Sequence, residues 1–303
     1  MANKRVDEAT GTPTVGHEWD GIEELDTPMP RWWLYTFYLT MVWGVIYVVL
    51  YPAWPLVNQA TEGVLGWSSR AELAEEMSTA DQARATVREA LARIPIERLP
   101  EDSALFGQAV AGGRSAFQVY CSQCHGSGAA GSQELGYPNL NDDDWLWGGD
   151  LRAIEYTLVH GIRQPAAEET RASLMPAFEG VFEPAQLDSL VSHVLSLNGG
   201  AQPNALGGQL FADNCAVCHG ARGGGDRTLG APRLNDAIWL YGGSREQVRR
   251  QVLQPRHGRM PHWGERLDPV TIKMLSAYVW SLGGGENFVE VAENPAVQVD
   301  EEP

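Results

Sequence analysis

The sequence contains few cysteines and few basic side chains. Its 303 residues include 4 cysteines, and 22 Lys and Arg residues stand against 39 Asp and Glu, for a formal net charge of −17. So few basic residues argue against nucleic acid as a partner, because phosphate groups are bound by clustered Lys and Arg. A basic partner protein is compatible with this charge.

Long uncharged runs are also scarce. Residues 32–51 form one stretch of 20 residues without Asp, Glu, Lys or Arg, which is enough for one helical crossing of a bilayer core. Aromatic residues flank it at both ends, as is typical of a membrane interface. The run is long for a buried core helix, and it starts too late for a cleaved signal peptide. We therefore expect an uncleaved membrane anchor at 32–57.

The basic residues around this run predict its orientation. Lys4, Arg5 and Arg31 precede it, whereas Arg70 alone lies within about twenty residues after it. Because cytoplasmic flanks carry the excess of Lys and Arg, we expect residues 1–31 to form a cytoplasmic arm. Everything after residue 57 is then exported, so the chain is a single-pass protein of the bacterial inner membrane with periplasmic domains.

Beyond the anchor the sequence divides into a linker, a repeat and a tail. Residues 58–106 are expected to form a helical linker, with Ser68 or Ser69 as N-cap and Pro95 closing the helix. Residues 107–200 and 201–284 resemble each other, and 285–303 form an acidic tail. The arm itself has no helical or strand periodicity.

The repeat is visible at two fixed offsets. Cys215 follows Cys121 by 94 residues, and at this offset Gly113 matches Gly207 and Trp145 matches Trp239. Further along the offset falls to 85, where Met175-Pro176 matches Met260-Pro261. Two modules of roughly 85 residues, made by duplication, explain this pattern better than one large domain.

All four cysteines belong to the repeat. They form two C-x-x-C-H motifs, Cys121-Cys124-His125 and Cys215-Cys218-His219. This pattern is typical of covalent haem c attachment, because two thiols one helical turn apart can add to the two porphyrin vinyl groups. The adjacent imidazole then becomes the proximal iron ligand. A redox dithiol or half of a zinc site are the alternatives, although no further cysteines complete a zinc tetrad.

Each haem iron needs a sixth ligand. Met175 and Met260 are the candidates, because each precedes a proline that restricts its backbone, whereas Met274 falls in the final helix and is expected in the core. A His/Met pair raises the potential and leaves no open coordination site. Whether each methionine serves its own module or the other is open. Rival ligands are His160, His193, His257 and His262.

Both modules resemble class I cytochrome c domains in their C-x-x-C-H motif, Pro-x-Leu segment, Met-Pro loop and closing helix. The resemblance implies an all-α fold, with one N-terminal transmembrane helix followed by two tandem domains of this class. It also implies that the carbonyls of Pro138 and Pro232 accept a hydrogen bond from the proximal histidines. Trp145 and Trp239 resemble family residues near the haem propionates.

The complete layout resembles the dihaem subunit (CcoP) of cbb3-type cytochrome c oxidases. The discriminating pieces are Asp20-Gly21-Ile22, Glu24-Leu25-Asp26 and Pro30-Arg31-Trp32-Trp33, although the single candidate membrane helix departs from some members. The resemblance implies that electrons pass from a soluble donor cytochrome c through two haems c to the monohaem subunit. They then reach a haem-copper subunit that reduces oxygen and pumps protons, so the chain itself is not catalytic.

Two other functions are compatible with the motifs. One is a membrane-tethered dihaem shuttle between a dehydrogenase or bc1-type complex and an oxidase. The other is a dihaem peroxidase, against which the two matched Met-Pro pairs argue. The modules also differ in charge, since residues 114–199 hold 4 basic and 11 acidic side chains and residues 207–283 hold 10 and 6. The acidic first module favours a basic donor, although both surfaces can equally reflect solubility.

Overall fold

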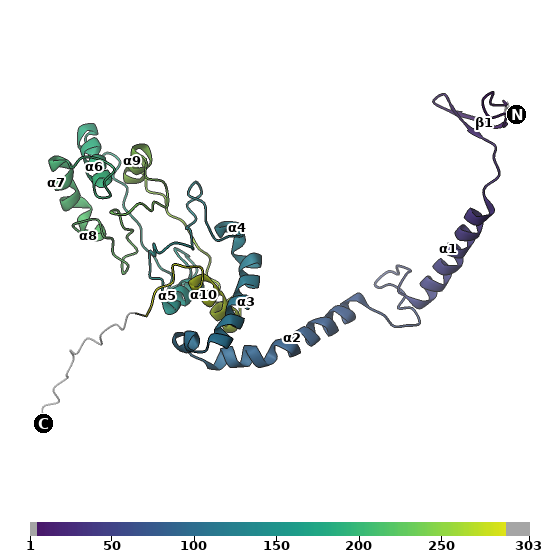
Figure 1. The fold of residues 1–303 in the computed structure, drawn as a ribbon, viewed down its shortest axis with the longest axis horizontal. Helices are drawn as coiled ribbons and strands as arrows, with labels where there is room; N and C mark the ends of the chain where they lie inside the picture. The colour runs from purple at the N-terminus through teal and green to yellow at the C-terminus, as the bar shows by residue number, and fades with distance from the viewer. Residues whose placement is uncertain (1–4, 289–303) are drawn as a thin grey trace. The chain divides into compact units, whose positions relative to one another are not determined.

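The computed structural model describes residues 5–288 of the chain (Figure 1). It divides into two compact units, residues 1–83 and residues 84–303, which we describe separately. Helix α2 (Ser69–Arg93) contains the boundary between them. Most of the predicted acidic tail, from residue 289 onward, lies outside the described residues, as does Lys4.

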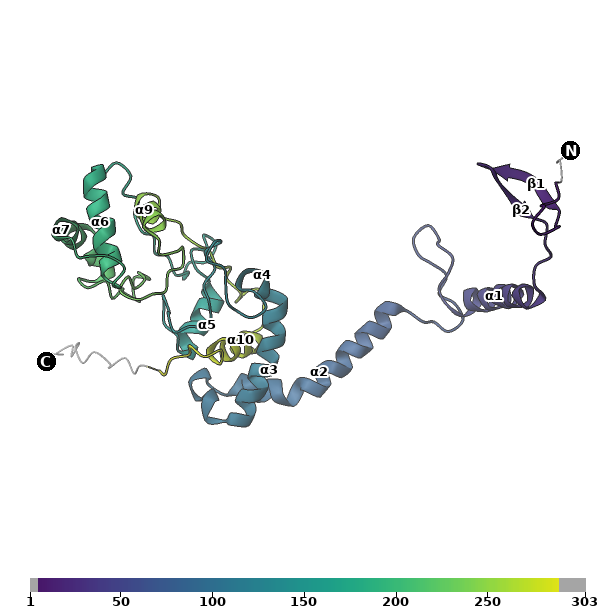
Figure 2. The same ribbon diagram turned by 45° about the horizontal axis from the view of Figure 1, so that its top comes forward.

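The first unit opens with a β-hairpin that the sequence did not predict. Strands β1 (Thr14–Trp19) and β2 (Ile22–Leu25) pair in antiparallel register, with Trp19 opposite Ile22 (Figure 2). Asp20 and Gly21 both have positive φ, at 49° and 85°, as a tight two-residue hairpin turn requires. The chain is therefore helix-rich rather than all-α.

Helix α1 (Arg31–Leu50) follows the hairpin and corresponds to the predicted anchor. Among the described residues it alone is long and apolar enough to cross a membrane, with a mean hydropathy of 1.7 and none of its residues buried inside the protein. Its last carbonyls are satisfied by the following loop, because Val64 N–H donates to Val49 at 2.9 Å and Leu65 N–H donates to Leu50 at 3.1 Å. Such pairing removes orphan acceptors where water is scarce.

The predicted linker helix is α2, which ends at Arg93 before the short 3₁₀ helix η1 (Ile96–Glu101). Lys273 caps its C-terminus by donating to the carbonyls of Leu91 and Ile94, at 2.7 and 2.6 Å. Leu91 and Leu99 are fully buried in a small apolar cluster with residues of later helices. The end of the linker is therefore part of the second unit rather than a free spacer.

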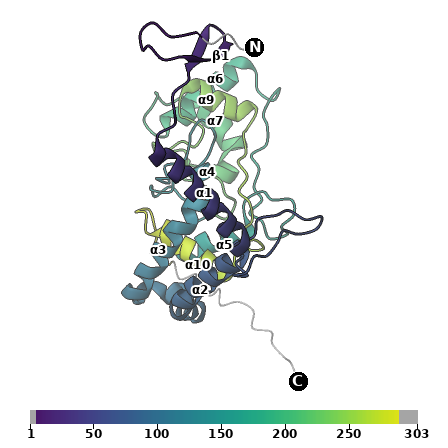
Figure 3. The same cartoon turned by 90° about the vertical axis from the view of Figure 1, so that its right-hand side faces the viewer.

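In the part of the second unit that the structure describes, eight α-helices follow the linker. They are α3 (Ser103–Tyr120), α4 (Ser122–His125), α5 (Leu151–His160), α6 (Pro184–Ser196), α7 (Ala205–Asn214), α8 (Ala216–His219), α9 (Arg245–Leu253) and α10 (Pro269–Trp280). Helices α3, α5 and α10 pack together, and α6 packs with α7 and α9 (Figure 3). The closing helix of each sequence repeat thus lies against the opening helix of the other.

Two apolar cores result from this exchange. The first core joins Phe117, Ile154 and Leu158 of the first repeat to Ile272, Leu275 and Tyr278 of the second. The second core joins Leu187, Leu190 and Val194 of the first repeat to Phe211, Val248 and Val252 of the second. The two repeats therefore do not coincide with the two packing cores. The division into domains at 107–200 and 201–284 stays a prediction.

We call this packing of each repeat's closing helix on the other repeat the exchange, and backbone hydrogen bonds between the repeats support it. Trp263 N–H donates to Leu158 at 2.9 Å, and at the equivalent place Phe178 N–H donates to Val252 at 3.2 Å. Met260 and Ile162 exchange both backbone hydrogen bonds, each at 3.0 Å. The segment after each methionine is thus held by the other repeat.

Close helix crossings require glycine at Gly113 in α3 and Gly207 in α7. A methyl group at Gly113 would collide with the Met274 carbonyl of α10, and one at Gly207 would collide with the Ser189 carbonyl of α6. These pairs are equivalent in the repeat, at offsets of 94 and 85. The same helix crossing therefore occurs twice, and each time it joins a helix of one repeat to a helix of the other.

We predict that Gly113→Ala destabilises the protein, because α3 and α10 must move apart. Overpacking of this kind costs about 2 kcal/mol, which lowers the melting temperature by roughly 4 °C in a domain of this size. The control is Gly107→Ala in the same helix, where the described residues leave room for a methyl group. It should be neutral or stabilising by up to about 1 kcal/mol. Thermal melts of the solubilised chain by circular dichroism measure both, and equal melting temperatures would contradict the exchanged crossing.

Candidate functional site

Each C-x-x-C-H motif begins where a long helix ends. Helix α3, capped by Asp102, delivers Cys121 to the start of the single-turn helix α4, and His125 N–H donates to the Cys121 carbonyl at 2.9 Å. In the second motif His219 N–H makes the same 2.9 Å bond to Cys215. The two cysteines and the histidine of each motif therefore share one helical turn, in which the second cysteine N–H also lies 3.2 Å from the carbonyl oxygen of the first. The two thiols are thus one turn apart, as the attachment chemistry requires.

The two histidines have the same ring orientation. Nδ1 of His125 lies 3.3 Å from the Pro138 carbonyl oxygen, and Nδ1 of His219 lies 3.0 Å from that of Pro232. Because a carbonyl only accepts, Nδ1 must carry the proton, and the lone pair of Nε2 is left for a metal. Burial lowers the pKa of both imidazoles, although the proline carbonyls oppose this. Both rings are thus kept in the neutral, ligating form.

The thiols do not resemble a redox dithiol. All four cysteines are unpaired; Cys121 is buried, whereas Cys124 and Cys218 are exposed. Burial raises the pKa of Cys121 and of Cys215 to about 11, with a smaller effect from the neighbouring cysteine. Reactive dithiols have a lowered pKa instead. No group of three or more His, Cys, Asp and Glu in the described residues could hold a metal ion, which disfavours zinc.

The two methionines lie in the exchanged cores. Met260 packs against the first core, which contains Cys121, and Met175, like Cys215, packs against the second core. Met175 N–H donates to Nε2 of His257 at 2.9 Å, so a histidine of the second repeat holds the methionine of the first. Each thioether therefore lies in the core whose cysteines belong to the other repeat. Apolar surroundings, a neutral imidazole and a thioether are a set of groups that fits haem c.

The remaining histidines have other partners. Nδ1 of His160 lies 3.3 Å from Glu169, and the ring of His193 packs 5.3 Å from that of Phe211. The pair Phe117 and Tyr278 makes the equivalent contact in the first core, at 5.2 Å. His262 lies 3.4 Å from Glu265. His160 and His257 thus make different contacts, and of these two only His257 bonds a predicted ligand residue.

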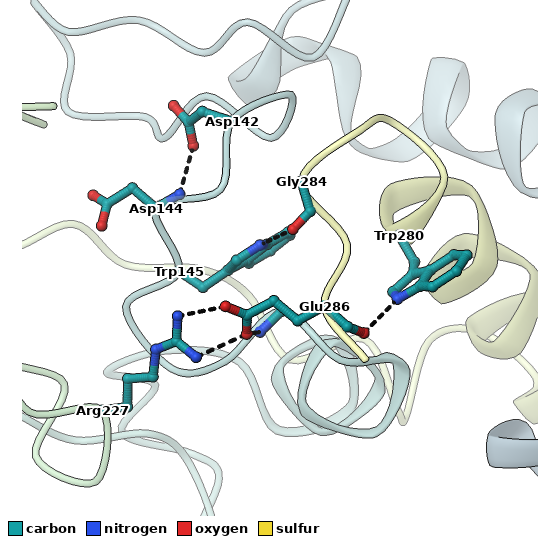
Figure 4. Close-up of polar contacts among 8 residues, drawn as sticks. Asp142, Asp144, Trp145, Arg227, Trp280, Gly284 and Glu286 are labelled. Carbon is teal, nitrogen blue, oxygen red and sulfur yellow. Dashed lines mark hydrogen bonds and ion pairs between the residues drawn. The ribbon is translucent and has the colours of Figure 1, made fainter. Parts of the chain in front are cut away.

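The predicted tryptophans lie in different surroundings. Trp145 packs against the first core and its indole N–H donates to the Gly284 carbonyl at 2.6 Å (Figure 4), while Trp239 packs against the second core. The indole N–H of Trp145 is therefore already used by the backbone. A role of either tryptophan beside a haem propionate stays a prediction.

The segment after α10 carries a polar clamp that the sequence did not indicate. The carboxylate of Glu286 accepts from both terminal nitrogens of Arg227, at 2.8 and 2.6 Å, and Trp280 donates to the Glu286 carbonyl at 2.8 Å (Figure 4). Gly149 N–H also donates to this carboxylate, at 2.8 Å. Although burial opposes it, the Arg227 guanidinium holds the pKa of Glu286 below its usual range. The clamp joins residues of both repeats.

Beside the clamp, Asp144 is a half-buried carboxyl group without a cationic hydrogen-bond partner among the described residues (Figure 4). Burial, followed by the carboxylates of Asp236 and Asp142, raises its pKa to about 6, against the opposing effect of Arg233 and Arg227. Because its folded-state pKa lies above that of an unfolded chain, the ionised carboxylate costs stability near neutral pH. Stability is regained as the pH falls through about 6.

We therefore predict that Asp144→Asn stabilises the protein at about pH 7.5 and has little effect at about pH 4.5. After allowance for solvent screening, the gain at the higher pH is about 1 kcal/mol, or roughly 3 °C in melting temperature. Glu168→Gln, at an exposed carboxyl, is the control and should change neither melt. Equal effects of Asp144→Asn at both pH values, measured by thermal denaturation, would refute this account.

Comparison with known families and proteins identifies the site. The model for the N-terminal domain of the cbb3 cytochrome oxidase protein FixP matches residues 11–58. The model for cytochrome c oxidase, cbb3-type, subunit III matches residues 108–194 and again residues 202–279. This second family is one of cytochromes c, and membership implies covalently bound haem c.

Relatives of known function match nearly the whole chain. The cbb3-type cytochrome c oxidase subunit FixP of Sinorhizobium medicae is 50% identical over 287 residues, which cover 94% of this chain and 99% of the relative. Subunit CcoP of Cereibacter sphaeroides is 49% identical over 279 residues, 90% of this chain and 96% of the relative. The chain therefore belongs to the FixP/CcoP family of cbb3-type cytochrome c oxidase subunits.

Proposed function

We propose that this chain binds two haem c groups covalently, one at Cys121 and Cys124 and one at Cys215 and Cys218. His125 and His219 are the proximal ligands. The observation that carries this proposal is the equal arrangement of the two sites, in which the proline carbonyl takes Nδ1–H and leaves Nε2 free. Haem bound in this way supplies one-electron redox chemistry.

We infer that the distal methionines are exchanged between the repeats. Met260 is then the sixth ligand in the first core and Met175 in the second. The packing of each methionine supports this assignment, as do the backbone bonds between Met260 and Ile162 and the bond from Met175 N–H to the His257 ring. A thioether on each iron closes the site to oxygen and peroxide and raises its potential.

The function that these sites support best is electron transfer within a cbb3-type oxidase. The chain would accept electrons from a soluble donor cytochrome c and pass them to the monohaem subunit, and from there to the haem-copper centre where oxygen is reduced. Relatives that share about half of its residues are named as subunits of this oxidase. With both axial positions filled, the chain transfers electrons and has no catalytic residues of its own. We place its N-terminus in the cytoplasm and both cores in the periplasm.

The ligand exchange is tested with one haem at a time. In a Cys215→Ala/Cys218→Ala background, which retains the first attachment site, Met260→Ala should abolish the sulfur-to-iron absorption band and lower the potential by roughly 0.2 V. Met175→Ala should leave that band in place. The complementary Cys121→Ala/Cys124→Ala background should give the reverse result.

Met274→Leu is the control for this series, because Met274 packs in the small cluster at the end of the linker helix. It should preserve the band in both backgrounds. Loss of the band on Met175→Ala in the first background would instead assign each methionine to its own repeat.

The assignment as an oxidase subunit predicts which components co-purify with the chain. Affinity purification of the tagged chain in mild detergent should recover haem b, copper and a monohaem cytochrome, with two haems c on the chain itself. Cys215→Ser/Cys218→Ser should keep the subunits together yet slow oxygen consumption driven by reduced cytochrome c at least about tenfold. Recovery of the chain alone would support a free shuttle instead.

A further inference from the structure

The N-terminal hairpin exposes two large apolar side chains at its tip. Trp19 and Ile22 are directly opposite each other in the ladder, so both side chains lie on the same face of the hairpin. They are 70% and 71% exposed. The tight turn at Asp20-Gly21 holds the pair together at the end of the two strands (Figure 2).

The opposite face of the hairpin is covered by the chain itself. Thr14 N–H donates to the Arg5 carbonyl at 2.7 Å, and the Thr14 side chain is buried. The carboxylate of Glu23, which alternates with Ile22 and so lies on this covered face, is 3.6 Å from the Arg5 guanidinium. A two-stranded hairpin is marginal by itself, and this backing fixes which face remains open.

The negative charge of the hairpin indicates whether its partner is a lipid surface or a protein. Residues 14–26 contain the five acidic residues Glu18, Asp20, Glu23, Glu24 and Asp26 and no Lys or Arg. The cytoplasmic leaflet is negatively charged and repels such a segment. Cytoplasmic loops of membrane proteins, in contrast, carry an excess of Lys and Arg. A basic protein surface is therefore the complementary partner.

The short connection to α1 limits where this partner can be. Residues 26–30 separate β2 from the first residue of α1, and five extended residues reach at most about 17 Å. The hairpin must therefore stay close to the membrane surface at which α1 begins. The loops within its reach are those of a membrane-embedded neighbour rather than of a soluble protein at a distance.

We propose that the hairpin is a docking element, which inserts Trp19 and Ile22 into an apolar pocket rimmed by Lys and Arg on the cytoplasmic loops of a membrane-embedded oxidase subunit. This inference rests on the proposed function, because it requires an oxidase partner and a cytoplasmic N-terminus. Tryptophan in a desolvated pocket is the residue type that most often dominates an interface. The acidic side chains around it set orientation and partner choice.

A photo-crosslinking experiment on the full chain in native membranes identifies the occupant. A benzophenone amino acid at position 19 should cross-link to a membrane subunit of the oxidase. The same probe at the exposed Glu8, outside the hairpin, is the control and should yield much less of this product. A lipid adduct at position 19, or no adduct above the control, overturns the proposal.

Retention of subunits in mild detergent gives an independent test. Trp19→Ser/Ile22→Ser should lower the haem b recovered with the chain about tenfold or more, with haem c content unchanged. Glu18→Lys/Glu24→Lys keeps the apolar pair and should lower recovery most at low salt, where charge attraction is least screened. Glu8→Lys should have no effect.

The two proposals fail differently in this experiment. Undiminished recovery with Trp19→Ser/Ile22→Ser overturns the docking element and leaves the proposed function intact. Failure of the unmodified chain to recover any haem b removes the oxidase assignment, and the docking proposal falls with it.

Discussion

Backbone pairing between the two repeats determines how this molecule is built. The chain leaving α5 is bonded to the segment that carries Met260, and the last turn of α9 is bonded to the segment that follows Met175. Because these are bonds between main-chain atoms, they depend on the path of the chain more than on particular side chains. Each core then receives its cysteines from one repeat and its closing helix from the other, so neither core is complete without both repeats.

The sequence predicts the components of this arrangement better than their assembly. The C-x-x-C-H motifs, the anchor and the linker helix depend on local spacing or composition, and helices α1 and α2 lie largely within the stretches expected for the anchor and the linker. The exchange has no local signal, because equivalent positions such as Gly113 and Gly207 meet equivalent carbonyls whichever repeat supplies them. Packing within one repeat and packing across repeats would bury the same residue types, so the sequence does not distinguish the two arrangements. The hairpin was missed for another reason, since a bulge between Thr14 and Glu18 breaks the alternation of its first strand.

In the candidate site, too, contacts between residues close in sequence can be predicted, and contacts between distant residues cannot. The proline carbonyls that orient His125 and His219 lie 13 residues along the chain, and a family resemblance suffices to find them. His257 bonds Met175 across 82 residues, and Glu286 meets Arg227 across 59 residues. No spacing rule points to either contact, because both exist only once the repeats have interlocked. Burial is the largest cause of the raised pKa of Asp144, and the carboxylates that add to it come from both repeats, Asp236 from the second and Asp142 from the first.

The order of segments gives the exchange a functional consequence. The second core is built from one continuous stretch, residues 172–253, whereas the first core needs residues 103–160 together with 260–283. The second core is therefore an insertion within the first and is tied to it at both ends. Two cores joined by one flexible linker would vary in separation, and electron transfer between them would vary as well. Here two chain segments, residues 161–171 and 254–259, connect the cores, and the Arg163 guanidinium of the first donates to the Gly258 carbonyl of the second at 2.8 Å. The double connection restricts how far the two cores can move apart, and with them the two proposed haem sites. The proposed recognition of the oxidase falls to the N-terminal hairpin, which shares no residue with either core.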